Sequence, residues 1–286
     1  MDNILQVQNL CKNYKTFHLK NVSFSVPKGS IMGFVGENGA GKTTTIKLIL
    51  NEIKRDGGSI NIFGLDSIKD ERKVKEQIGV VFDDCYFHKE FNAADIAKIL
   101  RKIYANWDQA QYESYLRKFS LAPDKKINEY SKGMKMKLSI ACALAHNPKL
   151  LILDEATSGL DPIMRSEILD IFLEFIQDEE HSVLFSSHIT SDLEKVADYV
   201  TFIHEGSIIF SRSKDDLLYQ YGILKCGSGD LSKINKSDIV RCRKNSFECE
   251  ILVADKQQAK RKYPNFVVDN ATLDEIMLLY VKGDVL

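Results

Sequence analysis

Long apolar runs, paired cysteines and an excess of charge of either sign are all missing from this chain of 286 residues. No apolar stretch approaches the roughly 20 residues that a membrane-spanning helix needs. The N-terminal MDNILQVQNLCKNYK lacks the basic head and apolar core of a secretion signal. The formal net charge is −1, so a nucleic-acid partner is not expected.

The cysteines argue against a structural zinc site. They lie at positions 11, 85, 142, 226, 242 and 249 and form no C-x-x-C pair. Because paired cysteines at that spacing are the usual signature of structural zinc, we expect none here. Reduced thiols, mostly packed in the interior, are the interpretation we prefer, as is usual for a cytoplasmic protein.

A glycine-rich segment, GENGAGKTTT at residues 36–45, stands between the apolar segments SIMGFV and IKLILNEI. It fits the pattern G-x-x-x-x-G-K-[ST]. In that pattern the backbone N–H groups of a tight loop and the N-terminus of the following helix bind phosphate. Lys42 is expected to reach the β- and γ-phosphates, and the Thr43 hydroxyl is expected to bind Mg²⁺.

The flanking segments provide the context that this motif requires. SIMGFVG predicts a short buried strand before the loop. After the loop, apolar residues spaced as on one face of a helix predict a helix; they are Ile46, Ile49, Leu50 and Ile53. A strand, a glycine-rich loop and a helix in this order favour a phosphate site over a glycine-rich turn without a ligand.

A second motif, KLLILDEATSGLDP at residues 149–162, supplies carboxylates. The apolar run Leu150–Leu153 is typical of a buried parallel strand and ends at Asp154 and Glu155, where open α/β sheets place their ligands. Asp154 is expected to hold Mg²⁺ through water, and Glu155 to orient or deprotonate the attacking water. A solvated acidic turn is the alternative, which the phosphate loop upstream disfavours.

These motifs occur in the order found in the ATP-binding subunits of ABC transporters, which the chain resembles over residues 1 to about 220. Tyr14, in CKNYK, matches the aromatic residue that stacks on adenine. YSKGMKMK matches the signature segment, Asp161 lies in the loop that matches the D-loop, and His188, in LFSSHI, matches the switch histidine that contacts the γ-phosphate. The resemblance assigns the phosphate loop to ATP binding, through Gly36, Glu37, Asn38, Gly39, Ala40, Gly41, Lys42, Thr43 and Thr44.

The signature segment also implies a second subunit. Ser131 is a good helix N-cap, and a capped helix start is an anion site. In the family, Ser131 and Gly133 face the γ-phosphate bound by another cassette, so the resemblance implies a dimer of identical or sister subunits. Taken alone, Ser131 and Gly133 would be a structural cap, Tyr14 a packing residue and His188 a polar residue at a strand end.

Two departures from the family pattern bear on the site. Where the family usually has glutamine after the strand IGVVF, this chain has Asp83. We hypothesise that Asp83 approaches Mg²⁺ or its waters. The signature reads Ser-Lys-Gly-Met instead of Ser-Gly-Gly-Gln, which puts Lys132 at a helix start. Its positive charge there is opposed by the helix dipole, but a γ-phosphate beside it would stabilise the charge by more than the dipole costs.

The alternation of strands and helices predicts an α/β fold with a mainly parallel core sheet, that of a P-loop ABC-type ATPase cassette. We assign residues 1–222 to this cassette, with antiparallel strands in 4–26 and a helical subdomain at about 84–147. Strands are expected at 78–82, 150–153, 183–186 and 199–203, and a closing hairpin turns at Glu205–Gly206.

A small α+β accessory region is expected at residues 223–286, and KCGSGD near its start, residues 225–230, is interpreted as a flexible break. SFECEILVA at 246–254 predicts a strand, and Thr272 with Glu275 forms a capping box at the start of an amphipathic helix. Packing or dimer contact is its expected role.

Aromatic residues gather just before the predicted helical subdomain. They are Tyr86, Phe87 and Phe91. In the family a groove here receives a short helix of the membrane subunit, so these side chains line that groove or belong to the core of the subdomain; the sequence favours neither.

The resemblance implies an ATPase that uses ATP and Mg²⁺ to power a bacterial exporter of the ABC-2 type, a group that includes phenol-soluble-modulin exporters. A separate integral membrane permease is then the partner, and the cytoplasmic face of the cell membrane the location. Drugs or amphipathic and antimicrobial peptides are the expected cargo. The alternative is a soluble ABC-type ATPase of DNA repair or translation, but repair members carry a long coiled-coil insertion and translation members usually carry two cassettes.

We predict that Asp83→Asn changes the Mg²⁺ dependence of ATP hydrolysis, because an amide removes the negative charge that a carboxylate offers a hard cation. ATPase rates measured over a Mg²⁺ titration test this. An unchanged Mg²⁺ requirement together with unchanged turnover would contradict the hypothesis.

Overall fold

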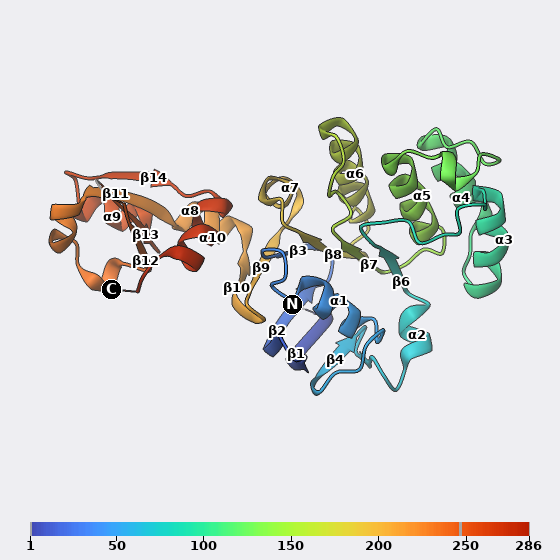
Figure 1. Cartoon of the computed structure of the whole chain (residues 1–286), viewed down its shortest axis with the longest axis horizontal. Coiled ribbons are helices and arrows are strands. Elements are labelled where there is room, and N and C mark those ends of the chain that lie inside the picture. Colours follow the sequence, from blue (N-terminus) through green and yellow to red (C-terminus); the bar gives the residue numbers. More distant parts are fainter. Residues whose placement is uncertain (1, 246–247, 286) are drawn as a thin grey trace.

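The computed structural model describes residues 2–245 and 248–285. A mainly parallel sheet runs through its centre, in the strand order β10-β9-β3-β8-β7-β6 (Figure 1). Its strands are β3 (Ile31–Val35), β6 (Ile78–Val81), β7 (Leu150–Asp154), β8 (Ser182–Ser187), β9 (Tyr199–His204) and β10 (Ser207–Ser213). All neighbours pair in parallel except β9 and β10, which form the predicted hairpin. The prediction of an α/β fold with a parallel core is confirmed.

Both faces of the core sheet are buried, which explains the unbroken apolar runs in the sequence. Successive side chains of a strand point to opposite faces. In β7, Leu151 and Leu153 belong to one buried cluster, whereas Leu150 and Ile152 belong to another. An alternating pattern would have left one face polar, so these runs favour a strand covered on both sides.

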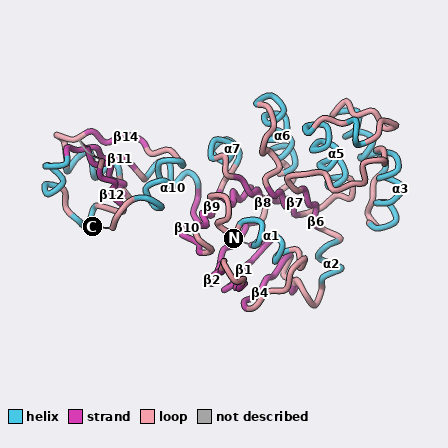
Figure 2. The backbone as a smooth tube through the Cα atoms, in the orientation of Figure 1, coloured by secondary structure: helices cyan, strands magenta, loops and turns pink. Residues whose placement is uncertain are grey.

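A second, antiparallel sheet lies on one side of the core sheet, in the order β2-β1-β4-β5 (Figure 2). It consists of β1 (Asn3–Asn13), β2 (His18–Pro27), β4 (Gly57–Ile62) and β5 (Leu65–Asp66). The predicted antiparallel strands on either side of Tyr14 are therefore confirmed, since β1 pairs with β2. Helix α2 (Glu71–Lys75) follows this sheet.

The first helix is shorter than predicted. Helix α1 (Lys42–Ile49) ends at its C-cap Leu50, and Ile53 lies beyond the helix. The cause is Asn51, whose φ of 56° is left-handed and stops the helical path. The prediction that Ile53 continues the helical face was wrong.

Helices cover the other side of the core sheet. They are α3 (Ala93–Ile103), α4 (Gln109–Lys118), α5 (Lys132–Leu144), α6 (Pro162–Phe175) and α7 (Thr190–Val196), with a short 3₁₀ turn at Ile127–Glu129. At four of these helices the N-cap side chain accepts a hydrogen bond from a backbone N–H of the first turn. These N-cap residues are Asn92 for α3, Asp108 for α4, Ser131 for α5 and Asp161 for α6. Among the helices of the described residues, none combines the length and apolarity of a transmembrane span.

The C-terminal residues build a third sheet, in the order β12-β13-β11-β14. The strands are β11 (Gly222–Gly227), β12 (Arg241–Lys244), β13 (Glu248–Val253) and β14 (Val267–Asn270), accompanied by α8 (Lys214–Gln220), α9 (Lys256–Lys262), α10 (Leu273–Lys282) and 3₁₀ turns at Ser228–Lys233 and Lys236–Asp238. The predicted strand at 246–254 is found as β13, while residues 246 and 247 lie outside the described residues.

The interpretation of KCGSGD as a flexible break was wrong. Lys225 to Gly227 end β11, which pairs with β13 on one side and, through Lys225, with β14 on the other. The Cys226 side chain is buried in the apolar core of this third sheet. Backbone pairing and burial override the glycine- and serine-rich composition that suggested a linker.

Helix α10 packs against α7 on one side and against β12 and β13 of the third sheet on the other. The predicted capping box of Thr272 and Glu275 begins the helix. Its buried side chains Leu273, Ile276 and Leu279 belong to the same apolar cluster as the core sheet. Figure 1 shows α10 on the side of the C-terminal region that faces the rest of the molecule.

Candidate functional site

The glycine-rich loop joins β3 to α1 at the carboxyl end of the central strand. A Cβ atom on Gly36 would lie 2.4 Å from the backbone oxygen of Ile203 in β9, so only glycine fits there. Gly41 occupies the N-cap of α1 with a φ of 116°, and no side chain caps this helix. Its first N–H groups therefore have no side-chain acceptor, which is the arrangement that suits a phosphate.

Lys42 holds a buried charge at the mouth of this loop. Its Nζ atom donates to the backbone oxygens of Gly36 at 2.7 Å and Glu37 at 3.2 Å. It also lies 3.2 Å from Oε1 of Glu155. Because the Lys42 side chain is only 5% exposed, its charge needs this carboxylate or another anion beside it.

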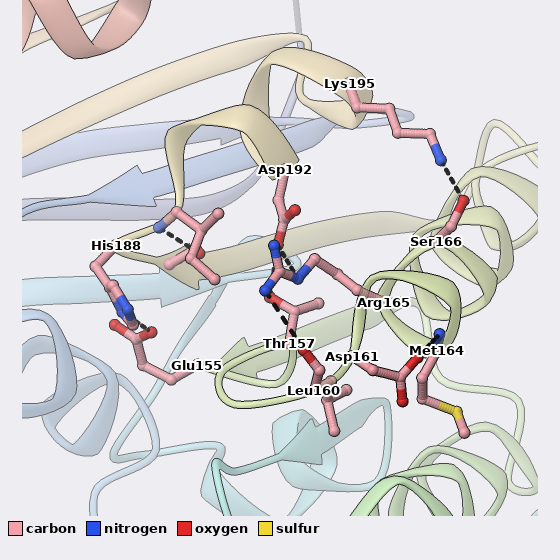
Figure 3. Close-up of polar contacts among 12 residues, drawn as sticks. Glu155, Thr157, Leu160, Asp161, Met164, Arg165, Ser166, His188, Asp192 and Lys195 are labelled. Atoms are coloured by element: carbon pink, nitrogen blue, oxygen red, sulfur yellow. Dashed lines mark hydrogen bonds and ion pairs between the residues drawn. The ribbon is translucent and has the colours of Figure 1, made fainter.

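Glu155 joins Lys42 to His188. Oε2 of Glu155 lies 2.6 Å from Nδ1 of His188, and Figure 3 shows the two side chains pointing toward one another. Glu155 itself has a φ of 54°, an uncommon backbone conformation for a residue with a side chain. Strain of this kind persists only where the surroundings enforce it, and it is concentrated at functional sites. The structure thus brings together the three residues predicted to be catalytic.

A cleft of about 660 Å³ opens over the loop. Its lining includes both Tyr14, which is 42% exposed, and Glu155. The residues that line it are Tyr14, Thr16, Phe17, Asn38, Gly39, Gly41, Lys42, Thr43, Thr44 and Glu155. An aromatic platform, a row of backbone N–H groups and a lysine in one cleft are arranged as a nucleoside triphosphate requires.

Asp154 carries an unsatisfied oxygen next to the same loop. The residue is 5% exposed, and its Oδ1 atom is buried without a hydrogen-bond partner. Burial raises the pKa of Asp154 above its ordinary value, whereas the Thr43 hydroxyl beside it acts in the opposite direction. The charges of Glu155 and Asp83 raise the pKa further, so Asp83 is also a neighbour.

This donor set fits Mg²⁺. A buried carboxylate oxygen without a partner costs free energy unless a cation or donor satisfies it. Within the described ranges no three His, Cys, Asp or Glu side chains are placed to enclose a metal ion. A magnesium ion bound with nucleotide does not need them, because one or two carboxylates, phosphate oxygens and waters are its usual ligands.

Ser131 and Gly133 lie elsewhere, at the start of α5. The Ser131 hydroxyl accepts from the N–H of Met134 at 3.2 Å, which confirms the predicted cap. A Cβ on Gly133 would lie 2.9 Å from the Met164 side chain of α6. These residues do not contribute to the cleft over the phosphate loop of their own chain.

A buried polar network that no sequence pattern indicated lies beside the residues predicted to be catalytic. Asp192 on α7 is 4% exposed and accepts from the Thr157 hydroxyl at 2.8 Å, with Nε of Arg165 at 3.8 Å (Figure 3). Burial raises the pKa of Asp192, and the Thr157 hydrogen bond and Arg165 charge oppose that shift. Thr157 lies within the KLLILDEATSGLDP motif, but no sequence pattern connects it with Asp192, because 35 positions separate the two residues.

The aromatic residues before the helices lie mostly at the surface. Tyr86 is 76% exposed, so the core alternative was wrong for this residue. Tyr86 and Phe87 line a groove of about 260 Å³ between the end of β6 and helices α3 and α5. Phe91 is 36% exposed and packs on His88 instead.

Comparison with known proteins is consistent with this geometry. Residues 19–158 match the family model described as ABC transporter. The lantibiotic transport ATP-binding protein SrtF of Streptococcus pyogenes is 38% identical over 74% of this chain and 92% of its own length. The bacitracin transport ATP-binding protein BcrA of Enterococcus faecalis is 32% identical over 73% and 69%. A solved ATP-binding subunit of an ABC transporter superposes with a TM-score of 0.66 at 28% identity, covering 75% of this chain and 91% of that one.

We predict that Gly36→Ala weakens ATP binding by about tenfold or more, since overpacking of this size costs roughly 1–3 kcal/mol. The added methyl group must push the loop away from the backbone of β9. Calorimetric titration measures the affinity, and Gly229→Ala is the control because nothing lies within 4 Å of a Cβ there. Parent-like affinity in Gly36→Ala would show that the loop does not form the binding surface.

Proposed function

This chain belongs to the family of ABC transporter ATP-binding proteins, and we propose that it hydrolyses ATP to power a bacterial exporter. The observation that carries the proposal is the contact of Lys42, Glu155 and His188 at the mouth of the phosphate loop. SrtF and BcrA, the relatives described above, are transport proteins, which supports export over the alternative of a soluble ATPase acting on nucleic acid or the ribosome.

Binding of ATP would exchange the partner of Lys42. In the structure Glu155 lies 3.2 Å from the ammonium group and neutralises it. A γ-phosphate carries more negative charge and would take its place, so the Glu155 carboxylate would be released to orient or deprotonate a water. His188 would keep Glu155 in position through its Nδ1 contact and could reach the γ-phosphate with the other side of its ring.

Magnesium would be held by the Thr43 hydroxyl, by Asp154 through water, and by Asp83, which would approach the ion or its waters. Bound there with ATP, the ion would neutralise charge on the β- and γ-phosphates. Asp154 is suited to this role because its buried Oδ1 atom lacks a hydrogen-bond partner. Tyr14, which lines the same cleft, would stack on the adenine.

A second cassette would complete the site. Ser131 and Gly133 lie outside the cleft of their own chain, so we infer that they contact ATP bound by a partner cassette, identical or sister. We assign residues 1–222 to the cassette and 223–286 to an accessory region. An integral membrane permease would be the other partner, at the cytoplasmic face of the membrane, and the names of SrtF and BcrA point to antimicrobial peptides as cargo.

We predict that Glu155→Gln abolishes ATP hydrolysis but keeps ATP binding, because the amide cannot accept a proton from water. Tagged full-length protein purified from membranes of its source organism with Mg–ATP should then retain an integral membrane protein in the ATP-bound state. Glu71→Gln, an exposed substitution on α2 next to Lys75, is the control and should behave like the parent. Recovery of nucleic acid or ribosomes in place of a membrane protein would contradict the proposal.

A further inference from the structure

Helix α7 follows directly after His188 and has little stability of its own. Its N-cap is Ile189, whose side chain cannot accept a hydrogen bond, and no side chain caps the helix. A helix of only seven residues is marginal in isolation. The position of α7 therefore depends on the elements packed against it, and the backbone that carries His188 moves with it.

Two hydrogen bonds connect helix α10 with helix α7, one donated by each helix. The Thr190 hydroxyl donates to Oδ1 of Asp274 at 2.8 Å. In the other direction, the N–H of Leu273 donates to Oε1 of Glu194 at 2.7 Å. Each helix thus satisfies a polar group of the other, and Thr190 is only 7% exposed, so solvent does not readily replace its partner.

Apolar contacts continue this connection into the core sheet. Leu273 and Ile276 of α10 share a buried cluster with Leu193 and Val196 of α7. A Cβ on Gly33 of β3 would lie 3.0 Å from the Leu193 side chain, so α7 rests closely on the central strand. Displacement of α10 would remove packing from one side of α7.

Other side chains of α7 form hydrogen bonds with the loop that follows Glu155 and with α6. Asp192 accepts from Thr157, and Lys195 donates to Ser166 of α6 at 2.7 Å. In Figure 3, Asp192 and Lys195 project from α7 toward these partners, and Asp192 lies between the Lys195–Ser166 contact and the contact of His188 with Glu155. Helix α7 is therefore held between the catalytic loop and α10.

We propose that Thr190 and Asp274 are positioning residues for ATP hydrolysis, whose hydrogen bond fixes the first turn of α7 and thereby holds His188 against Glu155. The inference rests on the proposed ATPase function and extends it to α10. Neither side chain contacts the nucleotide cleft; both act through α7.

The test compares substitutions that remove the hydrogen bond with substitutions that keep it. In full-length protein, Thr190→Val should lower kcat about fivefold, the loss expected for one hydrogen bond that positions a catalytic group, and change KM by less than about twofold. Thr190→Ser keeps the hydroxyl and should retain kcat within about twofold. Asp274→Ala should resemble Thr190→Val, whereas Asp274→Asn keeps an oxygen acceptor and should resemble the parent.

Two further variants separate positioning from general damage. Asp269→Ala removes another carboxylate of the same region, which pairs with Lys225 at 2.9 Å between β11 and β14, and it should leave kcat unchanged. The double variant Thr190→Val with Asp274→Ala should lose no more activity than either single variant, because both remove one interaction.

Nitrogen NMR of histidine-labelled protein gives a readout that does not require turnover. The His188 Nδ1 resonance should shift in Thr190→Val and in Asp274→Ala but not in Thr190→Ser. Parent-like kcat and resonance in the first two variants would overturn the inference, as would equal losses in Thr190→Val and Thr190→Ser. A parent protein that hydrolyses no ATP would refute the proposed function instead. The His188 resonance would still show whether the Thr190–Asp274 hydrogen bond positions His188.

Discussion

The pairing of the Lys42 ammonium group with an anion is the interaction on which the site depends. Its charge is buried at the mouth of a loop whose backbone offers both N–H donors and carbonyl acceptors. In the structure Glu155 supplies the anion, and a triphosphate would supply a stronger one. Under the proposed function, the same Lys42 ammonium group would bind phosphate and would control when the Glu155 carboxylate is free.

The core sheet is what makes this contact possible. Strands β3 and β7 are separated by β8, run parallel, and end at the same edge, so the loop after β3 and the carboxylates after β7 meet there. Apolar layers on both faces fix the strand ends. Such rigid support can maintain costly local features, namely the positive φ of Glu155 and the unpartnered oxygen of Asp154.

Local patterns in the sequence were sufficient for the parts of the fold that local chemistry decides. The phosphate loop, the apolar strands, the hairpin turn at Glu205–Gly206 and the capping box of α10 all follow from a few adjacent residues. The extent of α1 and the strand character of Lys225 to Gly227 did not, because a left-handed Asn51 and pairing with distant strands decided them. The Thr157–Asp192 contact likewise joins residues far apart in the chain and leaves no local signal.

Calorimetric titration of the full-length protein with Mg–ATP, set beside the same titration of Lys42→Ala, tests the central claim most directly. The account predicts binding by the parent and an affinity about thirtyfold lower or worse in Lys42→Ala, as expected when a charged hydrogen-bonding partner is lost. Lys47→Ala, on the same helix but outside the cleft lining, should bind like the parent. No Mg–ATP binding by the parent, or equal binding by Lys42→Ala, would contradict the account.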